Sequence, residues 1–347
     1  MVDKIAILDF GSLYAQLIAR RIREASVYCE LYPWDAPEDQ VMGPNTSGFI
    51  LSGGPASIYE GGAPQIPEYV IKSGLPILGI CYGMQALTAA LGGAVAPAAE
   101  REYGPADLHS VERNPILDQG RYTVWMSHGD RVERPPEGFA VLASTDNSPA
   151  AFIGDRERRY FGVQFHPEVH HTPQGAMFLK QFVLNVCGAQ PDWTPESIIK
   201  ESIGKIRDQV RDGRVLAAVS GGVDSSVAVA LVHKAVGDQL VSMFVDNGLL
   251  REGEVRQVVA AFQKHIGIEL VPIDARDRFM ARLKSVLDPE EKRRVIGETF
   301  IRIFEEQAIA VGMPPVLVQG TIYPDVVESQ DADRSKVELI KTHHNVG

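Results

Sequence analysis

Short apolar runs alternate with helical patterns along both halves of this chain, and no other feature restricts the fold as strongly. Strands and helices in alternation form a mostly parallel sheet that helices cover on both faces. In the first half the patterns predict strands at 5–8, 48–51 and 75–80 and helices at 14–24 and 84–91. In the second half they predict strands at 215–219, 241–245, 268–273 and 316–318 and helices at 223–236, 252–265 and 290–310.

A change of pattern and a short linker separate the two blocks. From about residue 100 to 163 the runs become short and β-like, and a helix is expected at 175–186. Residues 189–195 then carry two prolines, which mark a boundary. We therefore expect an α/β chain of two domains, residues 1–190 and 191–347, each a mostly parallel sheet flanked by helices.

Composition excludes several classes of protein. The 347 residues carry a net charge of −11, which argues against a chain that neutralises the phosphates of nucleic acid. No segment approaches the roughly 20 apolar residues that cross a membrane, and the N-terminus lacks the pattern of a signal peptide. The three cysteines are too few for a disulfide framework and fit a reducing compartment. We expect a cytoplasmic protein with no nucleic acid and no membrane among its partners.

A cysteine between two glycines lies where a predicted strand meets a predicted helix. The run Gly-Ile-Cys-Tyr-Gly at 79–83 matches the nucleophile elbow, with sulfur in place of oxygen. Small neighbours permit the sharp turn that lifts the thiol from the sheet and sets it beside a helix N-terminus, which favours the thiolate. Cys81 is therefore predicted as a nucleophile; the alternative is a buried structural cysteine.

A histidine and a glutamate follow a later strand and can serve that cysteine. His166 in Phe-His-Pro-Glu can take the thiol proton, and Glu168 can orient the imidazole. The competing base is His128, which lies in Ser-His-Gly-Asp.

His170 and His171 follow closely enough to raise a metal site with His166 as an alternative. Pro167 disrupts the helix that such a pair of ligands would need. No metal is predicted in this half of the chain.

Consecutive glycines supply candidate donors for an oxyanion. Leu-Ser-Gly-Gly-Pro at 51–55 follows a strand, so the N–H groups of Gly53 and Gly54 can point at a developing negative charge. The N–H of Tyr82 is a further donor beside the cysteine. Taken alone, Gly-Gly-Pro is also an ordinary turn.

A second candidate site follows the first strand of the second half. Ser-Gly-Gly-Val-Asp-Ser-Ser opens a helix and exposes N–H groups and hydroxyls to an anion. The Gly-Lys-Ser/Thr ending of a Walker A loop is absent, so the loop suits pyrophosphate better than γ-phosphoryl transfer. Asp224 could hold Mg²⁺. An ordinary helix cap is the alternative. The predicted loop residues are Ser220, Gly221, Gly222, Val223, Asp224, Ser225 and Ser226.

The motifs together resemble a known family. Residues 79–83 with 165–168 resemble the pattern of class I glutamine amidotransferases, and 220–226 resembles the pyrophosphate loop of N-type ATP pyrophosphatases. In this order they resemble the glutamine-hydrolysing GMP synthetase family over essentially the whole chain. Four further segments match it: 9–12, 245–248, 320–325 and 343–347.

For the first domain the resemblance implies a glutaminase. Cys81 would attack the glutamine amide, His166 would shuttle the proton, and Glu168 would orient His166. The groups implied to hold glutamine and its oxyanion are Gly53, Gly54, Tyr82 and Gln85.

For the second domain the resemblance implies an AMP-forming ligase. ATP would activate XMP, Mg²⁺ would accompany ATP at Asp224, and ammonia passed from the first domain would complete GMP in purine biosynthesis. Val245 and Phe300 would flank the adenine.

Two departures from the family stand out. Leu13 replaces a usual glutamine, with little consequence expected, and the chain ends at Gly347. Family members continue into a C-terminal dimerisation domain that supplies part of the XMP site. We therefore expect ATP binding and glutamine hydrolysis, with poor GMP formation.

Two other functions compete with this interpretation. Another glutamine-dependent, AMP-forming ligase such as NAD synthetase would share the pyrophosphate loop. A nucleotide sensor with a decayed glutaminase would need no intact cysteine, histidine and glutamate, and all three residues are present.

Overall fold

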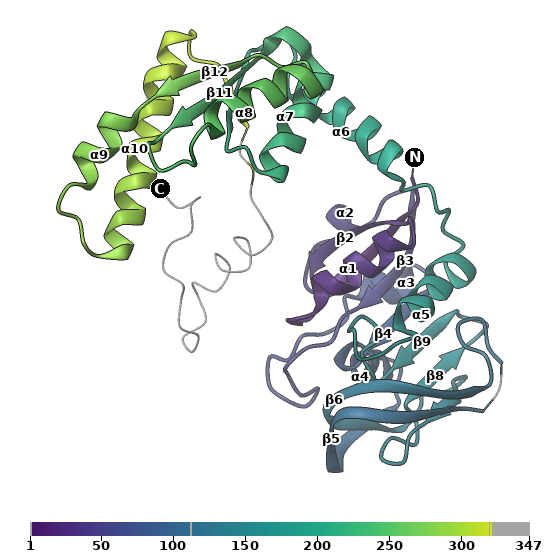
Figure 1. Cartoon of the computed structure of the whole chain (residues 1–347). Coiled ribbons are helices and arrows are strands. Elements are labelled where there is room, and N and C mark those ends of the chain that lie inside the picture. Colours follow the sequence, from purple (N-terminus) through teal and green to yellow (C-terminus); the bar gives the residue numbers. More distant parts are fainter. Residues whose placement is uncertain (1, 112, 319, 321–347) are drawn as a thin grey trace. The chain divides into compact units, whose positions relative to one another are not determined.

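The computed structural model describes residues 2–111, 113–318 and 320 (Figure 1). The chain divides into two compact units, Met1–Pro195 and Glu196–Gly347. The predicted domain boundary, after residue 190, lies a few residues before this division. Of the two late motifs, 320–325 and 343–347, only Gly320 lies within the described residues.

The first unit is built on a mixed sheet of nine strands in the order β2-β1-β3-β4-β9-β8-β7-β5-β6. Strands β2, β1, β3, β4 and β9 run parallel to their neighbours in this part of the sheet. The remaining strands, β8, β7, β5 and β6, pair antiparallel. The predicted α/β class is therefore confirmed, with an antiparallel extension in the region where the sequence pattern changed. The strands are β1 (Lys4–Asp9), β2 (Tyr28–Pro33), β3 (Thr46–Leu51), β4 (Ile77–Ile80), β5 (Ala94–Ser110), β6 (Gly120–Arg134), β7 (Ala140–Ser144), β8 (Phe152–Asp155) and β9 (Tyr160–Val163).

Alternate side chains of the parallel strands enter two different cores. In β1, Ile5 and Ile7 pack in one core with α1 and α5, whereas Ala6 and Leu8 pack in a second core with α2, α3 and α4. Successive strand residues point to opposite faces, so helices on both faces are required to cover this sheet. The helices of this unit are α1 (Ala15–Glu24), α2 (Glu38–Val41), α3 (Glu68–Lys72), α4 (Tyr82–Ala90) and α5 (Gly175–Gln181), which continues as a π-helical turn, η1 (Phe182–Val186).

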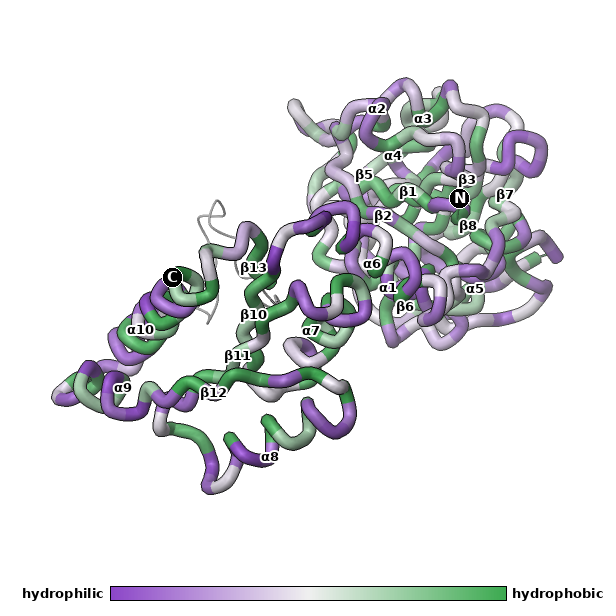
Figure 2. The backbone as a smooth tube through the Cα atoms, turned by 90° about the horizontal axis from the view of Figure 1, so that it is seen from above, coloured by the Kyte–Doolittle hydropathy of each residue, from purple (hydrophilic) through white to green (hydrophobic). Residues whose placement is uncertain are grey.

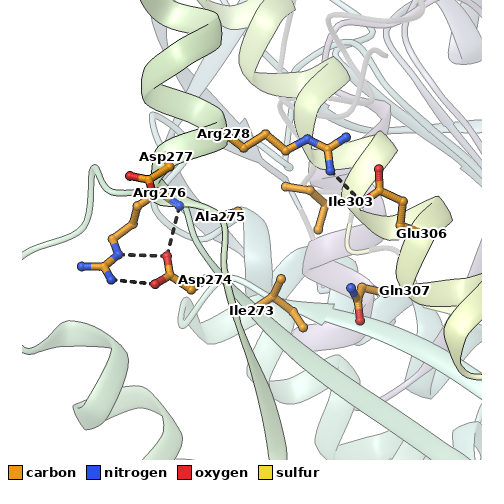
Figure 3. Close-up of a pocket in the computed structure, with 9 residues that line it drawn as sticks. All are labelled: Ile273, Asp274, Ala275, Arg276, Asp277, Arg278, Ile303, Glu306 and Gln307. Atoms are coloured by element: carbon orange, nitrogen blue, oxygen red, sulfur yellow. Dashed lines mark hydrogen bonds and ion pairs between the residues drawn. The ribbon is translucent and has the colours of Figure 1, made fainter.

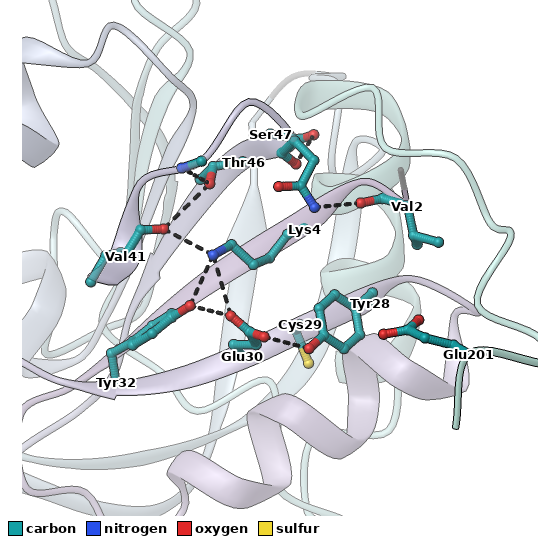
Figure 4. A network of polar contacts seen from close by, with 12 residues as sticks. Val2, Lys4, Tyr28, Cys29, Glu30, Tyr32, Val41, Thr46, Ser47 and Glu201 are labelled. Carbon is teal, nitrogen blue, oxygen red and sulfur yellow. Dashed lines mark hydrogen bonds and ion pairs between the residues drawn. The ribbon is translucent and has the colours of Figure 1, made fainter. Parts of the chain in front are cut away.

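A buried lysine joins the edge strand β2 to the sheet (Figure 4). The ammonium of Lys4 donates to Glu30 Oε2 at 3.2 Å, to the Tyr32 hydroxyl at 2.8 Å and to the main-chain oxygen of Val41 at 3.0 Å. Three acceptors compensate the loss of water around this charge.

The second unit contains an all-parallel sheet in the order β12-β11-β10-β13. Strand β10 is apolar along its length (Figure 2), as expected for a parallel strand covered on both faces. The strands are β10 (Val215–Val219), β11 (Leu240–Asp246), β12 (Leu270–Asp274) and β13 (Val316–Val318). The helices are α6 (Pro195–Val210), α7 (Val223–Val236), η2 (Gly237–Gln239), α8 (Glu254–Ala261), η3 (Phe262–Ile266), α9 (Arg276–Leu283) and α10 (Pro289–Ala310).

Helix α10 begins where its sequence predicts. Asp288 caps it by accepting a hydrogen bond from the N–H of Glu291 at 2.8 Å, and Pro289 occupies the first turn. Within the described part of the chain, no helix is both long and apolar enough to span a membrane.

Candidate active site

Cys81 occupies a strained turn between β4 and α4. Its φ of 52° and ψ of −107° are rare for a residue with a side chain, and such strain is typical of functional sites. The N–H of Cys81 donates to the main-chain oxygen of Val163 at 2.7 Å, so the turn is fixed to the end of β9. A Cβ at Gly79 would lie 2.6 Å from main-chain atoms of Gly83, and only glycine fits there. The chain therefore forms the elbow that its glycine spacing predicts.

The neighbouring strand β9 brings the predicted base to the same edge of the sheet. Because β4 and β9 are parallel neighbours, the segments that follow them lie together. The Nδ1–H of His166 donates to Glu168 Oε1 at 2.7 Å, and both side chains are buried. Burial lowers the pKa of His166, but the charge of Glu168 and side-chain hydrogen bonds with Cys81 and Glu168 outweigh it and raise the pKa well above its ordinary value.

Two further residues define the space around the imidazole. The ring of Tyr14 meets that of His166 edge-on, with centroids 5.7 Å apart. A Cβ at Gly53 would lie 3.1 Å from Cε1 of His166 and 3.8 Å from Cβ of Cys81. Gly53 therefore faces both side chains, and its missing Cβ leaves room beside the thiol.

The other residues predicted for glutamine binding lie on α4 and on the loop after β3. Gln85 is buried and donates from Nε2 to the main-chain oxygen of Asp130 at 2.8 Å. Tyr82 is buried with its hydroxyl donating to Pro64, and burial raises its pKa to about 12. Gly54 packs against Phe10, whose main-chain oxygen would lie 2.6 Å from an added Cβ.

The competing base, His128, is engaged elsewhere. Its Nε2 lies 3.1 Å from Glu102 Oε2 and its Nδ1 lies 3.0 Å from the main-chain oxygen of Asp130. Thr145 and Ser148 also donate to Glu102. Sequence reasoning missed Glu102, because it meets His128 only through the pairing of β5 with β6. These contacts link β5 to β6, the strand that runs beside the thiol of Cys81.

The neighbouring histidines do not gather around His166. The ring of His171 stacks on Trp125 with centroids 4.4 Å apart, and His170 is exposed. Among the described residues, no group of three or more His, Cys, Asp or Glu side chains is arranged to hold a metal.

In the second unit the predicted loop comprises the turn after β10 and the first turn of α7. Gly221 has a φ of +80°, which glycine adopts without strain. The hydroxyls of Ser225 and Ser226 donate to the main-chain oxygen of Gly222 at 3.1 Å and 2.6 Å. Asp224 is exposed in the first turn. The loop thus presents a helix N-terminus and a carboxylate to solvent, which suits an anion bound together with a cation.

The two residues predicted to flank adenine lie within one apolar cluster. Val245 ends the buried part of β11, and Phe300 packs edge-on against Phe279 with ring centroids 4.9 Å apart. A cavity of about 470 Å³ opens beside this cluster, at the carboxyl end of β12 (Figure 3). Its lining comprises Ile273, Asp274, Ala275, Arg276, Asp277, Arg278, Ile303, Glu306 and Gln307.

Four charged side chains of that cavity form two ion pairs. Arg276 donates to Asp274 at 2.6 Å and 2.9 Å and lowers the pKa of this carboxyl to about 2. Arg278 donates to Glu306 at 2.7 Å. Among the described residues that line this cavity, none belongs to the 220–226 loop.

Comparison with known proteins identifies the family. The family model for class-I glutamine amidotransferase matches residues 6–186. A GMP synthase (glutamine-hydrolysing) from Thermomicrobium roseum is 55% identical over 99% of this chain and 66% of its own length. One from Alkalilimnicola ehrlichii is 52% identical over 99% of this chain and 67% of its own length.

The chain belongs to the glutamine-hydrolysing GMP synthase family. The family resemblance predicted from the sequence motifs is therefore confirmed, and with it membership of a family of glutamine-hydrolysing ligases. The chain spans about two thirds of the length of these GMP synthases. A solved structure of a candidate GMP synthase subunit from Thermoplasma acidophilum is 28% identical, with a TM-score of 0.46, over 54% of this chain and 95% of its own.

Proposed function

We propose that the first unit hydrolyses glutamine with Cys81 as nucleophile, His166 as base and Glu168 as the residue that orients the base. One observation carries this proposal: the 2.7 Å contact between His166 and Glu168 fixes an imidazole beside the strained elbow, where Gly53 faces both His166 and Cys81. Nucleophile, base and orienter in this arrangement are sufficient for acyl transfer.

The reaction proceeds in two balanced steps. The Cys81 sulfur attacks the amide carbon of glutamine while His166 takes the thiol proton. Collapse of the tetrahedral intermediate breaks the C–N bond, and His166 returns the proton to the leaving ammonia. Water then attacks the thioester, His166 takes a proton from this water, and the thiol is restored as glutamate leaves.

Main-chain donors favour the tetrahedral intermediate. Tyr82 is the first residue of α4, so its N–H has no partner within the helix. Together with the N–H of Gly54 it would hold the oxyanion, at the positive end of the helix.

We propose further that the whole protein transfers this ammonia to XMP, with ATP split to AMP and pyrophosphate. The loop at 220–226 would hold the pyrophosphate, as its place before α7 favours. Asp224 offers a hard oxygen ligand, and ATP phosphates would complete the shell of a Mg²⁺ ion that neutralises their charge. Three free cysteines fit action in a reducing compartment such as the cytoplasm.

Amide-¹⁵N glutamine with Mg-ATP and XMP tests both parts. Labelled GMP with equal amounts of AMP and pyrophosphate would support the full reaction. Label found only in free ammonia would support glutamine hydrolysis but contradict the transfer of ammonia to XMP by this chain. Cys81→Ser should abolish glutamate formation, whereas Cys187→Ala, at a cysteine outside the elbow, should retain it. In a parallel incubation with deamido-NAD in place of XMP, label in the product NAD without label in GMP would contradict the acceptor. Full hydrolysis by Cys81→Ser would contradict the nucleophile.

A further inference from the structure

Gln164 is buried beside the sulfur of Cys81, although no step above uses it. It follows β9 directly, its side chain is fully buried, and its N–H donates to the main-chain oxygen of Ala151 at 2.9 Å. Its amide Nε2 lies 3.6 Å from Sγ of Cys81, within hydrogen-bond distance for sulfur. A buried amide in contact with a nucleophile calls for a chemical explanation.

The hydrogen-bond partners fix which way this amide points. The main-chain oxygen of Asp130 can only accept, so the atom of Gln85 that lies 2.8 Å from it is the NH₂ nitrogen. That nitrogen also lies 3.3 Å from Gln164 Oε1, which therefore accepts. The opposite end of the Gln164 amide is then NH₂, and it faces Sγ.

Sγ of Cys81 thus contacts one hydrogen-bond acceptor and one donor. The main-chain oxygen of Ser127, at 3.6 Å, can accept a hydrogen bond only from the thiol form. The NH₂ of Gln164 can bond to the thiolate, and hydrogen bonds to a charged acceptor are the stronger kind. His166 is the titratable group that faces the thiol across Gly53, and Glu168 accepts a hydrogen bond from its far side.

We propose that Gln164 donates a hydrogen bond to the Cys81 thiolate, holding the sulfur in its attacking position and favouring its charged form. The inference rests on the proposed glutaminase and adds a residue to its machinery. Gln85 and the main-chain oxygen of Asp130 preset the donor, so no reorganisation is needed when the thiol ionises.

The test is the pH dependence of Cys81 alkylation by iodoacetamide in the full chain, with the modified site identified by mass spectrometry. Gln164→Met keeps the length and removes the donor, and Gln164→Glu replaces the NH₂ with oxygen. Both should move the alkylation midpoint upward by about one pH unit, more for Glu because of its charge, with roughly tenfold lower kcat/KM for glutamine. Burial raises the pKa of Cys29 to about 11, so this cysteine should not interfere.

Thr88→Val is the matched control. Thr88 is also fully buried and lies on the same helix, α4, as Gln85. Loss of the Thr88 hydroxyl should leave the alkylation midpoint of Cys81 unchanged. An unchanged or lowered midpoint in both Gln164 variants would overturn the proposal. Alkylation of Cys81 does not require glutamine turnover. If the parent chain hydrolyses no glutamine, the proposed function is refuted, and the alkylation midpoints still decide the role of Gln164.

Discussion

The main-chain oxygen of Leu51 lies so close to Gly83 that no residue with a Cβ fits at position 83. An added Cβ would be 2.3 Å from this oxygen, far inside contact distance. The N–H of Gly83 also donates to the oxygen of Ser52 at 3.0 Å. The second glycine of the elbow therefore lets α4 pass close to the end of β3, and this close passage sets where the thiol emerges.

Gly83→Ala should unfold the elbow rather than merely strain it. We expect a loss of about 3 kcal/mol in the free energy of unfolding of the first unit, together with loss of glutamine hydrolysis. The measurement is urea unfolding followed by tryptophan fluorescence, because all three tryptophans of the chain, Trp34, Trp125 and Trp193, lie in this unit. Gly61→Ala, where nothing lies within 4 Å of the added Cβ, should be neutral.

Much of the site could be predicted because its determinants are local. The elbow at 79–83 combines a strand end, two small residues and a helix start, all visible in a short window. In the second unit the predicted strands at 215–219 and 316–318 and the helix at 223–236 match β10, β13 and α7.

What was missed depends on pairing between distant segments. Glu102 meets His128 through the register of β5 and β6, two long strands that the sequence pattern showed only as short β-like runs. Prolines and glycines interrupt the apolar alternation of β5, as at Pro97, Gly104 and Pro105. Gln164 gives no periodic signal either, since its importance comes only from the atoms around it.

The raised pKa of His166 predicts that the first unit loses stability in alkali. A group whose folded pKa exceeds its unfolded value, about 6.5 for histidine, stabilises fully below that value. This contribution disappears as the pH rises through the folded pKa. The free energy of unfolding should therefore fall above about pH 6.5 in the parent chain and fall less in Glu168→Gln, which removes the charge behind the shift.

The same substitution should slow glutamine hydrolysis on the order of 10³-fold, because the imidazole loses its orienting partner. His170→Gln is the control, since its side chain is exposed, and it should keep the parental pH slope. Identical slopes in the parent and in Glu168→Gln would refute the role given to this pair.

Glu102 should stabilise the first unit with the opposite dependence on pH. Burial raises the pKa of Glu102, but hydrogen bonds from His128 and Ser148 outweigh it, so the folded pKa is lowered. Its contribution is present above the unfolded pKa of about 4.3 and disappears as the pH falls through the folded pKa. Glu102→Gln should cost about 1–3 kcal/mol near neutral pH, and its stability should converge with that of the parent in acid.

Glu133→Gln provides the comparison for Glu102. Glu133 lies on β6 like His128 and pairs with Arg131 at 2.7 Å, but in an exposed position. Its loss should cost less than about 1 kcal/mol at any pH. A cost for Glu102→Gln that persists unchanged in acid would show that packing, and not its charge, is what matters.

The ammonium of Lys4 predicts a contribution to stability that is lost at high pH. Burial lowers the pKa of Lys4, but hydrogen bonds with Tyr32 and Glu30 outweigh it and raise the folded pKa. The contribution is therefore present below the unfolded pKa of about 10.4 and lost above the folded one. Lys4→Met should cost about 1–3 kcal/mol near neutral pH by urea unfolding, whereas Lys72→Met, from an exposed pair with Glu68, should cost little.

Gly221→Ala should separate the two half-reactions. Gly221 has a φ of +80°, and an added Cβ would lie 3.0 Å from Cγ2 of Val258, so alanine strains both the backbone and the packing of the loop. ATP-dependent pyrophosphate release should fall at least about tenfold, because the left-handed conformation costs alanine roughly 1–2 kcal/mol, and glutamine hydrolysis should persist. Gly267→Ala supplies the control: its φ of +77° is also left-handed, with nothing within 4 Å of the added Cβ. An equal loss of pyrophosphate release in both variants would mean that general destabilisation of this unit, and not the shape of the loop, explains the effect.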